Sequence, residues 1–407
     1  MESINSMIDA YIHTRYGNSD NYTYLLERLN GLSNEIYKLK ILDKYSGVTK
    51  ELCVFRKFGK LSAMVDRNLE GNIIDQLSKE GLTPKTIFSE LKCCRFEEYI
   101  DDSDVVDKDT ARSEYFIERI TTLLVFYSTL SVIYDYHMVN QSIDGLDRID
   151  IKIQQIYDHI HTRLKIDKDR NIYDSLVKMS DKANENFLSF SDKFLKFYFS
   201  QKDHSEIDQS IYTQFEKFSY YVKNFKNLFL KVFPSKGLLV LNHNDVHKLN
   251  LLCIEGRDKI YILDHEYAGL NLIGIDIVNF LIETNYDYTI DVFPYYEYSP
   301  ELIDLQAYYK IFLKFVDEFI LKHQQVSARV TEEIEKYMEE IKNFEYFLRL
   351  VRVVSLFWLS WSAVKIDFDA FEKKKSFDYF KHAMDRISLF ETADKIWYNQ
   401  KICFNKK

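Results

Sequence analysis

Proline and glycine are scarce in this chain of 407 residues, which contains four prolines and eleven glycines. Six of the glycines lie between residues 17 and 81, three lie between residues 256 and 274, and none follows Gly274. Segments interrupted by glycine suit strands and tight turns, whereas long uninterrupted segments suit helices. The sequence therefore predicts a strand-rich region over about the first hundred residues and a mainly helical region after it, apart from the segment around Gly256.

Cysteine is also scarce, and the chain has no excess of positive charge. The five cysteines show no metal-ligand spacing, and we interpret the adjacent pair Cys93 and Cys94 as part of a buried strand. An odd number of cysteines without a disulfide framework fits a reducing compartment. The net charge of −9 argues against a protein that binds a nucleic-acid backbone, so no nucleic-acid partner is expected. An anionic nucleotide would need metal ions and a few basic residues.

Long hydrophobic runs are absent as well. No run reaches 18 uncharged apolar residues, so neither a transmembrane helix nor stable membrane insertion is expected. Residues 1–17 lack the apolar core of a signal peptide. Together with the cysteine content, these observations predict a cytoplasmic protein.

The length and apolar content predict a globular protein with two lobes. Hydrophobic residues make up 46% of the chain, enough for a large core. The chain is also longer than the domain length at which a single hydrophobic core usually stops growing. The acidic run over residues 101–109 is the best candidate boundary. We therefore predict a first domain over residues 1–100, which covers a nucleotide, and a second over residues 101–407, which contains the candidate catalytic hairpin.

Residues 238–267 predict a β-hairpin. Two short apolar runs, residues 249–254 and 259–263, flank the polar turn Glu255-Gly256-Arg257-Asp258. Asp245 and Asn250 stand before or at the start of the first strand, and Asp264 and Glu266 follow the second. Side chains at the open end of a hairpin can converge on one small volume.

The spacing of these residues is that of a kinase site. Asn250 follows Asp245 by five residues and Asp264 follows it by nineteen, close to the spacing of a kinase catalytic loop and its metal-binding Asp. In kinase chemistry one Asp orients or deprotonates the attacking hydroxyl, while an Asn and a second Asp hold magnesium ions. For any single residue, a solvated carboxylate on an ordinary hairpin is the alternative; the four together favour phosphoryl transfer.

The strand-rich region contains candidate nucleotide contacts. The predicted strands 24–29 and 36–42 are joined by a turn of small residues. Its backbone amides could approach the phosphates of a nucleotide, and an ordinary hairpin turn is the alternative. A third strand ends at Arg56, the candidate cation for the nucleotide, with Glu70 on a predicted helix as its candidate partner. A further strand over residues 92–100 leads into a linker where an adenine could bond to the backbone. The candidate ATP-binding residues are Asn30, Gly31, Leu32, Ser33, Asn34, Arg56, Glu98 and Ile100.

Several segments resemble the choline/ethanolamine kinase family. The resemblance is carried by the hairpin, by IDIVNFLIETNYDY at residues 275–288 and by SLFWLSWSAVK at residues 355–365. LNGLSN at residues 29–34 and RFEEYI at residues 95–100 extend it toward the N-terminus, whereas residues 141–233 match least. That family has a eukaryotic-protein-kinase-like fold and transfers the γ-phosphate of ATP to the hydroxyl of choline or ethanolamine.

The resemblance implies an α+β, two-lobed protein-kinase-like fold, with a small β-rich N-lobe and a large, mainly helical C-lobe. It implies ATP and Mg²⁺ as cofactors, choline or ethanolamine as substrate, and the first step of the CDP-choline or CDP-ethanolamine route to phospholipids. By analogy with the family, an amphipathic helix over residues 3–16 is a candidate element of a homodimer.

The resemblance also implies roles for individual residues. Asp245 would be the catalytic base, with Asn250 and Asp264 as magnesium ligands and Arg56 as the basic residue that reaches ATP. The residues implied for substrate binding are Glu266, Tyr267, Glu283, Tyr288, Trp358, Trp361 and Tyr379.

The chemistry of an ammonium group agrees with these assignments. A quaternary ammonium has no N–H donor and is best held by aromatic faces and a nearby carboxylate. Trp358 and Trp361 lie three residues apart in a predicted helix, so their side chains share one face. A core stripe of aromatic residues is the alternative, although two of only three tryptophans are paired here.

The chain departs from the family pattern at three positions. His265 stands where the family often has Phe, Leu249 where it commonly has Gly, and Thr284 where many members have Trp. We interpret His265 as a neutral aromatic substitute. Choline and ethanolamine both remain possible substrates, and a related aminoglycoside-phosphotransferase-like kinase or a catalytically inactive scaffold on the same fold are the alternative functions.

Overall fold

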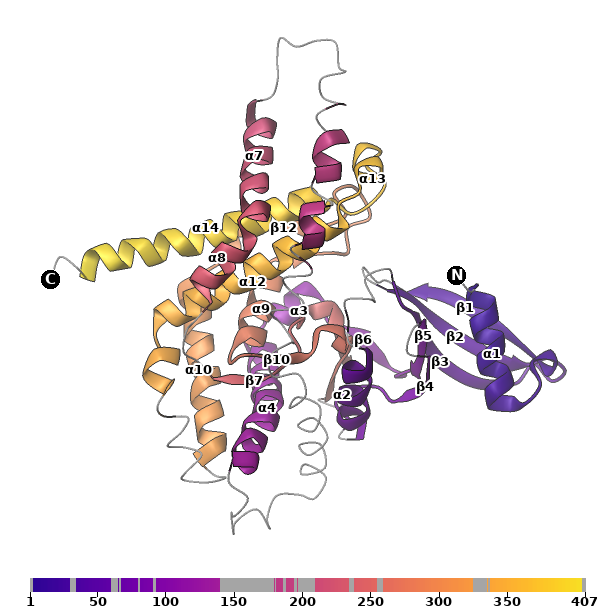
Figure 1. The fold of residues 1–407 in the computed structure, drawn as a ribbon. Coiled ribbons are helices and arrows are strands. Elements are labelled where there is room, and N and C mark those ends of the chain that lie inside the picture. The colour runs from indigo at the N-terminus through magenta and orange to yellow at the C-terminus, as the bar shows by residue number, and fades with distance from the viewer. Residues whose placement is uncertain are drawn as a thin grey trace. The chain divides into compact units, whose positions relative to one another are not determined.

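The computed structural model divides into two compact units (Figure 1), which are described in turn. Of the described residues, the first unit contains those up to Val106 together with Leu249–Ala268, and the second contains all the others. The sequence had placed the hairpin in the second domain, but in the structure it belongs to the first unit because its first strand pairs with residues 103–105. The structure describes residues 3–29, 34–59, 65, 67–79, 81–90, 93–139, 179, 181–185, 188–193, 196, 209–233, 238–254, 259–324, 335 and 337–404.

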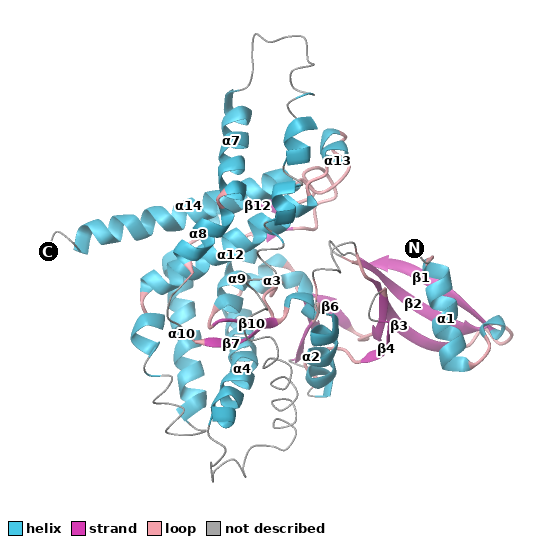
Figure 2. Ribbon diagram, in the orientation of Figure 1, coloured by secondary structure: helices cyan, strands magenta, loops and turns pink. Residues whose placement is uncertain are grey.

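The first unit is built on a five-stranded antiparallel sheet of order β1-β2-β3-β5-β4. Its strands are β1 (Tyr22–Leu29), β2 (Glu35–Asp43), β3 (Thr49–Lys57), β4 (Thr86–Glu90) and β5 (Cys94–Glu98). In Figure 2 these strands form most of the first unit, whereas the second unit is mainly helical. The prediction of a β-rich first region and a helical second region is confirmed.

Helix α1 (Ile4–Tyr16) packs its apolar face on this sheet. Ser3 begins the helix by accepting the Ser6 N–H at 3.1 Å, and Gly17 ends it in the left-handed conformation, with φ of 83°. The amphipathic helix predicted over residues 3–16 is confirmed, and the Tyr11 ring stacks on Phe96 with a centroid distance of 4.0 Å. The shared core contains Met7, Ile8, Tyr11, Ile12, Leu39, Ile41, Cys53, Phe55, Cys94 and Phe96.

The predicted hairpin is also confirmed. Strands β8 (Leu251–Ile254) and β9 (Lys259–Ile262) pair antiparallel, and β6 (Ser103–Val105) pairs with β8 to complete a three-stranded sheet. The turn between β8 and β9 lies outside the described residues. Helix α2 (Arg67–Lys79) completes the described helices of this unit.

The second unit contains long helices and two small antiparallel sheets. Strand β7 (Leu239–Asn242) pairs with β10 (Gly269–Leu272), and β11 (Tyr286–Asp287) pairs with β12 (Glu297–Tyr298). One of its long helices is α4 (Glu114–Val139). The other helices are α3 (Lys108–Arg112), α7 (Gln209–Lys223), α8 (Phe225–Val232), α9 (Ile275–Glu283), α10 (Leu305–Gln324), α12 (Phe344–Lys365), α13 (Phe368–Glu372) and α14 (Tyr379–Phe404).

Helix α12 is long and apolar enough to cross a membrane by length and composition alone. The search for uncharged runs did not predict this, because Arg349 and Arg352 interrupt the helix. In the structure 89% of its most apolar window is buried inside the protein, and α12 packs along α14 (Figure 1). The core helix of a globular protein has these same properties, so the helix is weak evidence for a membrane span.

Candidate active site

In the first unit, the end of strand β3 places Arg56 beside Asp264. Arg56 Nη1 lies 2.9 Å from Asp264 Oδ2, and its Nε lies 3.5 Å from Glu97 Oε2. The Arg56 side chain is buried, with 4% of its surface exposed. Burial alone would lower the pKa of Arg56, but Asp264 and Glu97 hold it above its ordinary value. A fixed positive charge therefore stands next to the predicted metal-binding Asp.

Glu70 is not the direct ion-pair partner of Arg56 that the sequence predicted. Its carboxylate instead accepts hydrogen bonds from Arg67 at 2.7 Å and pairs with Arg95 at 2.9 Å. Arg95 lies opposite Arg56 in the β3–β5 register and donates to Glu97 at 2.7 Å. The prediction was wrong because Glu97, rather than Glu70, shares the sheet surface on which Arg56 ends.

The predicted magnesium ligands Asn250 and Asp264 come together at the open end of the hairpin. The N–H of Leu263 donates to the Asn250 carbonyl at 2.8 Å, so Asp264 follows directly after a residue bonded to Asn250. Asp264 has a left-handed backbone, with φ of 62° and ψ of 64°, which Asp tolerates better than most residues.

One carboxylate oxygen of Asp264 accepts no hydrogen bond. Its Oδ2 faces Arg56, whereas its Oδ1 is buried and has no hydrogen-bond partner. Burial would raise the pKa of Asp264, but the guanidiniums of Arg56 and Arg95 hold it below its ordinary value. An ionised carboxylate with an unused oxygen, beside an Asn, provides the hard oxygen ligands that Mg²⁺ prefers. The residues present therefore fit a magnesium ion.

Glu266 connects the hairpin to the predicted nucleotide-covering turn. Its Oε2 accepts from Asn34 Nδ2 and from Arg67 Nη2, each at 3.2 Å. Asn34 Oδ1 in turn accepts the Gly59 N–H at 3.1 Å. Burial raises the pKa of Glu266, and the negative charge of Asp264 raises it further. The other predicted residues of that turn, Asn30, Gly31, Leu32 and Ser33, lie outside the described residues.

The remaining predicted residues of the first unit are Glu98, Ile100 and Tyr267. Glu98 ends β5 with an exposed side chain, and its backbone N–H donates to the Lys85 carbonyl at 2.8 Å. Ile100 lies just beyond the strand and is partly buried, and Tyr267 follows Glu266 in a short 3₁₀ turn. His265 is 1% exposed and its Nε2 lies 3.2 Å from the Ile262 carbonyl. This environment agrees with our interpretation of His265 as a substitute for an aromatic core residue.

In the second unit, Asp276 holds the loop that carries Asp245. The backbone N–H groups of His243 and Asn244 donate to the two carboxylate oxygens of Asp276, at 2.7 and 2.8 Å. Burial raises the pKa of Asp276 to about 7, although these two hydrogen bonds act to lower it. Asn244 has a left-handed backbone with φ of 65°. Asp245 therefore follows directly after two residues that are anchored to the start of α9.

Asn279, one turn further along α9, braces the other end of the loop. Its Nδ2 donates to the Val246 carbonyl at 3.0 Å, and its Oδ1 accepts from Trp358 Nε1 at 2.7 Å. The indole N–H of Trp358 thus supports, through Asn279, the loop that carries the predicted catalytic residue Asp245. His247 Nε2 lies 3.6 Å from Asp245 Oδ1. Neither Asp276 nor Asn279 was singled out from the sequence, although both lie in the quoted segment IDIVNFLIETNYDY.

Glu283, the predicted amine-binding acid, is paired with an arginine that the sequence did not reveal. Arg386 Nη2 donates to Glu283 Oε1 at 2.5 Å, and the Tyr288 hydroxyl donates to Oε2 at 2.9 Å. Arg386 is fully buried, and its guanidinium lies 4.0 Å from the centroid of the Tyr286 ring. Burial would lower the pKa of Arg386, but Glu283 holds it above its ordinary value. The charge of Glu283 is therefore offset inside the protein.

His382 is held neutral beside this ion pair. Its Nε2 lies 3.1 Å from Arg386 Nη2, and its Nδ1 lies 2.6 Å from Ser362 Oγ. Ser362 donates its own proton to the Trp358 carbonyl at 2.8 Å, so it accepts from Nδ1–H. Burial places the pKa of His382 well below its ordinary value, and the charges of Arg386 and Lys381 lower it further. No local sequence pattern predicts a functional role for this histidine.

The predicted aromatic walls in the second unit do come together. The Trp361 ring lies 5.5 Å from Trp358 and 5.6 Å from Tyr379, in each case with the rings edge to face. The Tyr288 ring, 9° from parallel, stacks on Tyr286 at 5.9 Å. Trp361 is 5% exposed, and its Nε1 has no hydrogen-bond partner. We refer to Trp358, Trp361 and Tyr379 below as the aromatic cage.

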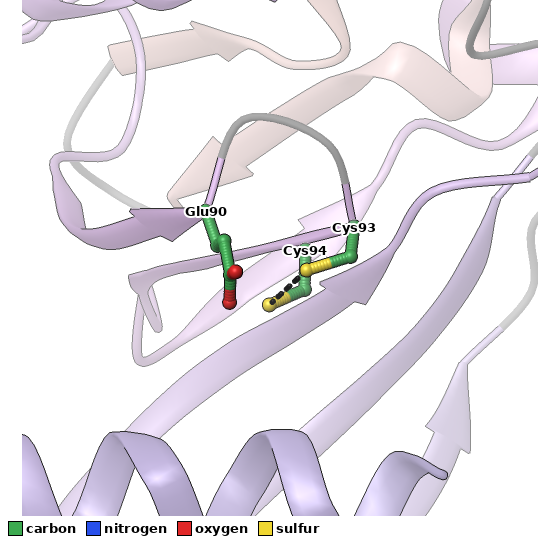
Figure 3. Close-up of side chains that lie close together, drawn as sticks. All are labelled: Glu90, Cys93 and Cys94. Atoms are coloured by element: carbon green, nitrogen blue, oxygen red, sulfur yellow. Dashed lines mark hydrogen bonds between the residues drawn. The ribbon is translucent and has the colours of Figure 1, made fainter. Parts of the chain in front are cut away.

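Among the described residues, one group of side chains has the geometry of a soft-metal site. Glu90, Cys93 and Cys94 place their ligand atoms within 4.8 Å of one another (Figure 3). The two sulfur atoms are 3.8 Å apart, but burial, together with Cys94 and Glu90, raises the pKa of the Cys93 thiol to about 12. Because metals bind the thiolate, such a thiol is a poor ligand. Cys94 is a buried strand residue, as expected, but the same prediction was wrong for Cys93, which precedes the strand and is only partly buried.

A protein family and several curated proteins are similar to this chain in sequence. The family described as Choline/ethanolamine kinase matches residues 26–391 of the chain. A choline/ethanolamine kinase of Rattus norvegicus is 27% identical over 155 residues, which are 37% of this chain and 37% of that protein. Choline kinase alpha of Mus musculus is 26% identical over 163 residues, covering 38% of this chain and 34% of that protein. The chain thus aligns with little more than a third of the length of these curated relatives.

Solved structures show the same fold. A choline kinase of Cryptosporidium parvum has a TM-score of 0.59 and 18% identity, with 98% of this chain and 97% of that one covered. An ethanolamine kinase of Plasmodium vivax has a TM-score of 0.52 and 14% identity, with 97% and 92% covered. At this identity the likeness shows a protein-kinase-like fold. With the family match over most of its length, the chain belongs to the choline/ethanolamine kinase family.

Proposed function

We propose that this protein transfers the γ-phosphate of ATP to the hydroxyl of choline or ethanolamine, the first step of the CDP-choline or CDP-ethanolamine route to phospholipids. The observation that carries the proposal is the buried Asp264, whose Oδ1 has no hydrogen-bond partner while Arg56 holds the carboxylate ionised. A structural carboxylate would be expected to use both oxygens, because an unpaired buried acceptor costs free energy. Family membership supplies the reaction class.

Asp245 is the residue we assign to the acceptor hydroxyl. Its carboxylate would accept the hydrogen bond of the hydroxyl, orient the oxygen toward the γ-phosphate and receive the proton as the bond to phosphorus forms. The fixed loop supports this role, since the two hydrogen bonds to Asp276 position Asp245 without a cost of ordering it during the reaction.

Asn250 and Asp264 would hold Mg²⁺, which, when bound, neutralises negative charge on the phosphates of ATP. Arg56 supplies a fixed positive charge beside Asp264. Glu266, two residues after Asp264, accepts a hydrogen bond from Asn34 in the proposed nucleotide-covering turn. Their charges are arranged for a nucleotide even though the whole chain has a net charge of −9.

The aromatic cage is our proposed location for the ammonium group of the substrate. The His382 ring lies 6.1 Å from Trp361 of this cage and 6.3 Å from Tyr288. Trp361 offers an indole, the aromatic ring that attracts cations most strongly. Among the described residues, Cys53, Cys93, Cys94 and Cys253 form no disulfide, which supports our proposal of a cytoplasmic location because disulfides are rare there. We keep a homodimer as a proposal from the family resemblance, with α1 as the candidate element.

Measurement of ADP release tests the proposed function. ATP and Mg²⁺ are supplied with choline, ethanolamine or the aminoglycoside kanamycin, each at the same concentration. We expect release to rise with one or both amino alcohols and not with kanamycin. Stimulation by kanamycin alone would indicate an aminoglycoside kinase, and release that no acceptor stimulates would indicate a scaffold; either result contradicts the proposal.

A further inference from the structure

The aromatic cage already contacts a cation of the chain itself. Lys365 Nζ lies 4.1 Å from the centroid of the Trp361 ring and 5.9 Å from that of Tyr379. Both distances are within the range of about 6 Å over which an ammonium is attracted to an aromatic face. One lysine ammonium therefore contacts two of the three residues to which the substrate ammonium has been assigned.

The position of Lys365 in the sequence explains this contact. It is the last residue of α12 and follows Trp361 by four residues, one helical turn. Long side chains on a helix lean back toward its N-terminus, over the residue four positions earlier. The lysine stem is thus directed along the surface that Trp361 presents.

We propose that Lys365 is an internal competitor for the ammonium group of the substrate, and that the free energy of displacing it limits the affinity for the amine. This inference rests on the proposed function. A lysine ammonium and the ammonium of choline carry the same charge and interact with the same aromatic quadrupole, so they cannot occupy one face together. Lys365 is therefore a specificity-determining residue.

Arg386 cannot play the same part, although it is also a cation near the predicted substrate residues. It is fully buried, donates to Glu283 and lies against the Tyr286 ring. Lys365 is only partly buried and stands at the end of its helix on a flexible four-carbon stem. Displacement of Arg386 would leave the buried Glu283 carboxylate without this ion pair, whereas Lys365 is partly exposed at the end of its helix, so Lys365 is the cation that we expect a substrate to displace.

Competition by Lys365 should weigh more heavily on choline than on ethanolamine. A trimethylammonium group has no N–H donor, so aromatic faces provide most of its binding. A primary ammonium can also donate hydrogen bonds to oxygen acceptors, which Lys365 does not block. Removal of the lysine charge is therefore expected to improve choline binding more.

Calorimetric titration with tetramethylammonium tests the inference. This probe has no hydroxyl and cannot be phosphorylated, so its binding does not depend on the proposed reaction. We expect the Kd of Lys365→Met to be lower than that of the wild type by about three- to tenfold, the factor that follows from cation–π magnitudes. Lys365→Gln should behave in the same way, and Lys365→Arg should retain the wild-type Kd.

The matched control is Lys373→Met, which removes the same charge from an exposed lysine beyond the helix. It should leave the Kd unchanged, which separates the local contact from the change in net charge. An unchanged or higher Kd in both Lys365→Met and Lys365→Gln, or a fall of the same size in Lys373→Met, would overturn the inference. A wild type that binds tetramethylammonium but releases ADP with neither choline nor ethanolamine would instead refute the proposed function.

Discussion

At the scale of single residues, the Glu283 side chain accepts one hydrogen bond on each carboxylate oxygen, from Arg386 and from Tyr288. Glu283 is 3% exposed and Arg386 is fully buried, so neither charge is solvated by bulk water. A buried ion pair contributes little net stability when it is complete, but removal of one partner leaves an uncompensated charge. Glu283 is therefore a structural residue as well as a candidate for contact with the amine.

The Arg386–Glu283 pair gives a prediction at this scale. Arg386→Met should lower the free energy of unfolding by about 3–5 kcal/mol, since Glu283 is left buried and charged. The double variant Arg386→Met with Glu283→Gln should recover a large part of this loss, because no buried charge remains. Denaturant unfolding of the wild type, both single variants and the double variant measures the coupling. If the loss of unfolding free energy in the double variant equals the sum of the losses in the two single variants, the proposed pairing is contradicted.

At the scale of elements, helix α9 organises the catalytic loop through residues three positions apart, Asp276 and Asn279. Asp276 accepts the backbone N–H groups of His243 and Asn244, and Asn279 donates to the Val246 carbonyl. The loop is thus fixed at residues on both sides of Asp245. Trp358 of α12 donates to Asn279 of the same helix, α9. Asn279 therefore contacts both a residue of the aromatic cage and the loop that carries Asp245.

Asp276→Asn tests this support. An amide has one acceptor oxygen, so one of the two loop N–H groups would face an NH₂ group and lose its bond. We expect kcat to fall by roughly ten- to a hundredfold, as for a misplaced catalytic group, while the KM for ATP changes little. Steady-state kinetics at varied ATP provide the measurement. Asp291→Asn, at an exposed aspartate, is the matched control. An unchanged kcat in Asp276→Asn would show that the loop does not need this anchor.

The local elements were predictable from the sequence, whereas the long-range pairs were not. Helical spacing gave α1, and two short apolar runs on either side of a polar turn gave the hairpin, because each signal is contained in one short segment. Arg386 lies 103 positions after its partner Glu283, and no periodicity connects them. For the same reason Arg56 was assigned to Glu70 in the next helix, although the β3–β5 register brings it to Glu97.

At the scale of the whole molecule, each unit contributes its own part of the proposed chemistry. The first unit holds the buried network of arginines and carboxylates around Asp264, and the second holds Asp245, Glu283 and the aromatic cage. The chain passes from the one to the other between Lys248 and Leu249, within the five residues that separate Asp245 from Asn250. The arginines of this network are paired with carboxylates, so a nucleotide would need Mg²⁺ as well as Arg56 to offset the charge of its phosphates, in keeping with the net charge of −9.

The network in the first unit predicts how stability depends on pH. Burial alone would raise the pKa of Glu97, but Arg95 and Arg56 hold it below its ordinary value. A depressed pKa contributes stability above the unfolded value of about 4.3, and that contribution is lost as the pH falls through the folded value. Glu97→Gln should therefore be less stable than the wild type at pH 7, by about 2 kcal/mol, with a smaller difference below about pH 4.

Urea unfolding of both proteins at pH 7, 5 and 3.5 measures this difference. Glu98→Gln is the control, because the Glu98 side chain, next to Glu97 in the sequence, is exposed. It should follow the wild type at every pH. A difference between Glu97→Gln and the wild type that stays constant over the whole range would show that ionisation of Glu97 does not stabilise the network.

The central claim, phosphoryl transfer from ATP to an amino alcohol with Asp245 as the base, is tested most directly by identification of the product. The wild type and Asp245→Ala are incubated with ATP, Mg²⁺ and either choline or ethanolamine, and the phosphorus-containing products are resolved by ³¹P NMR. We predict that the wild type forms phosphocholine or phosphoethanolamine and that Asp245→Ala forms it at least about a thousandfold more slowly, while its Kd for ATP stays within about twofold. Absence of a phosphorylated amino alcohol with the wild type, or its formation at a similar rate by Asp245→Ala, would contradict the account.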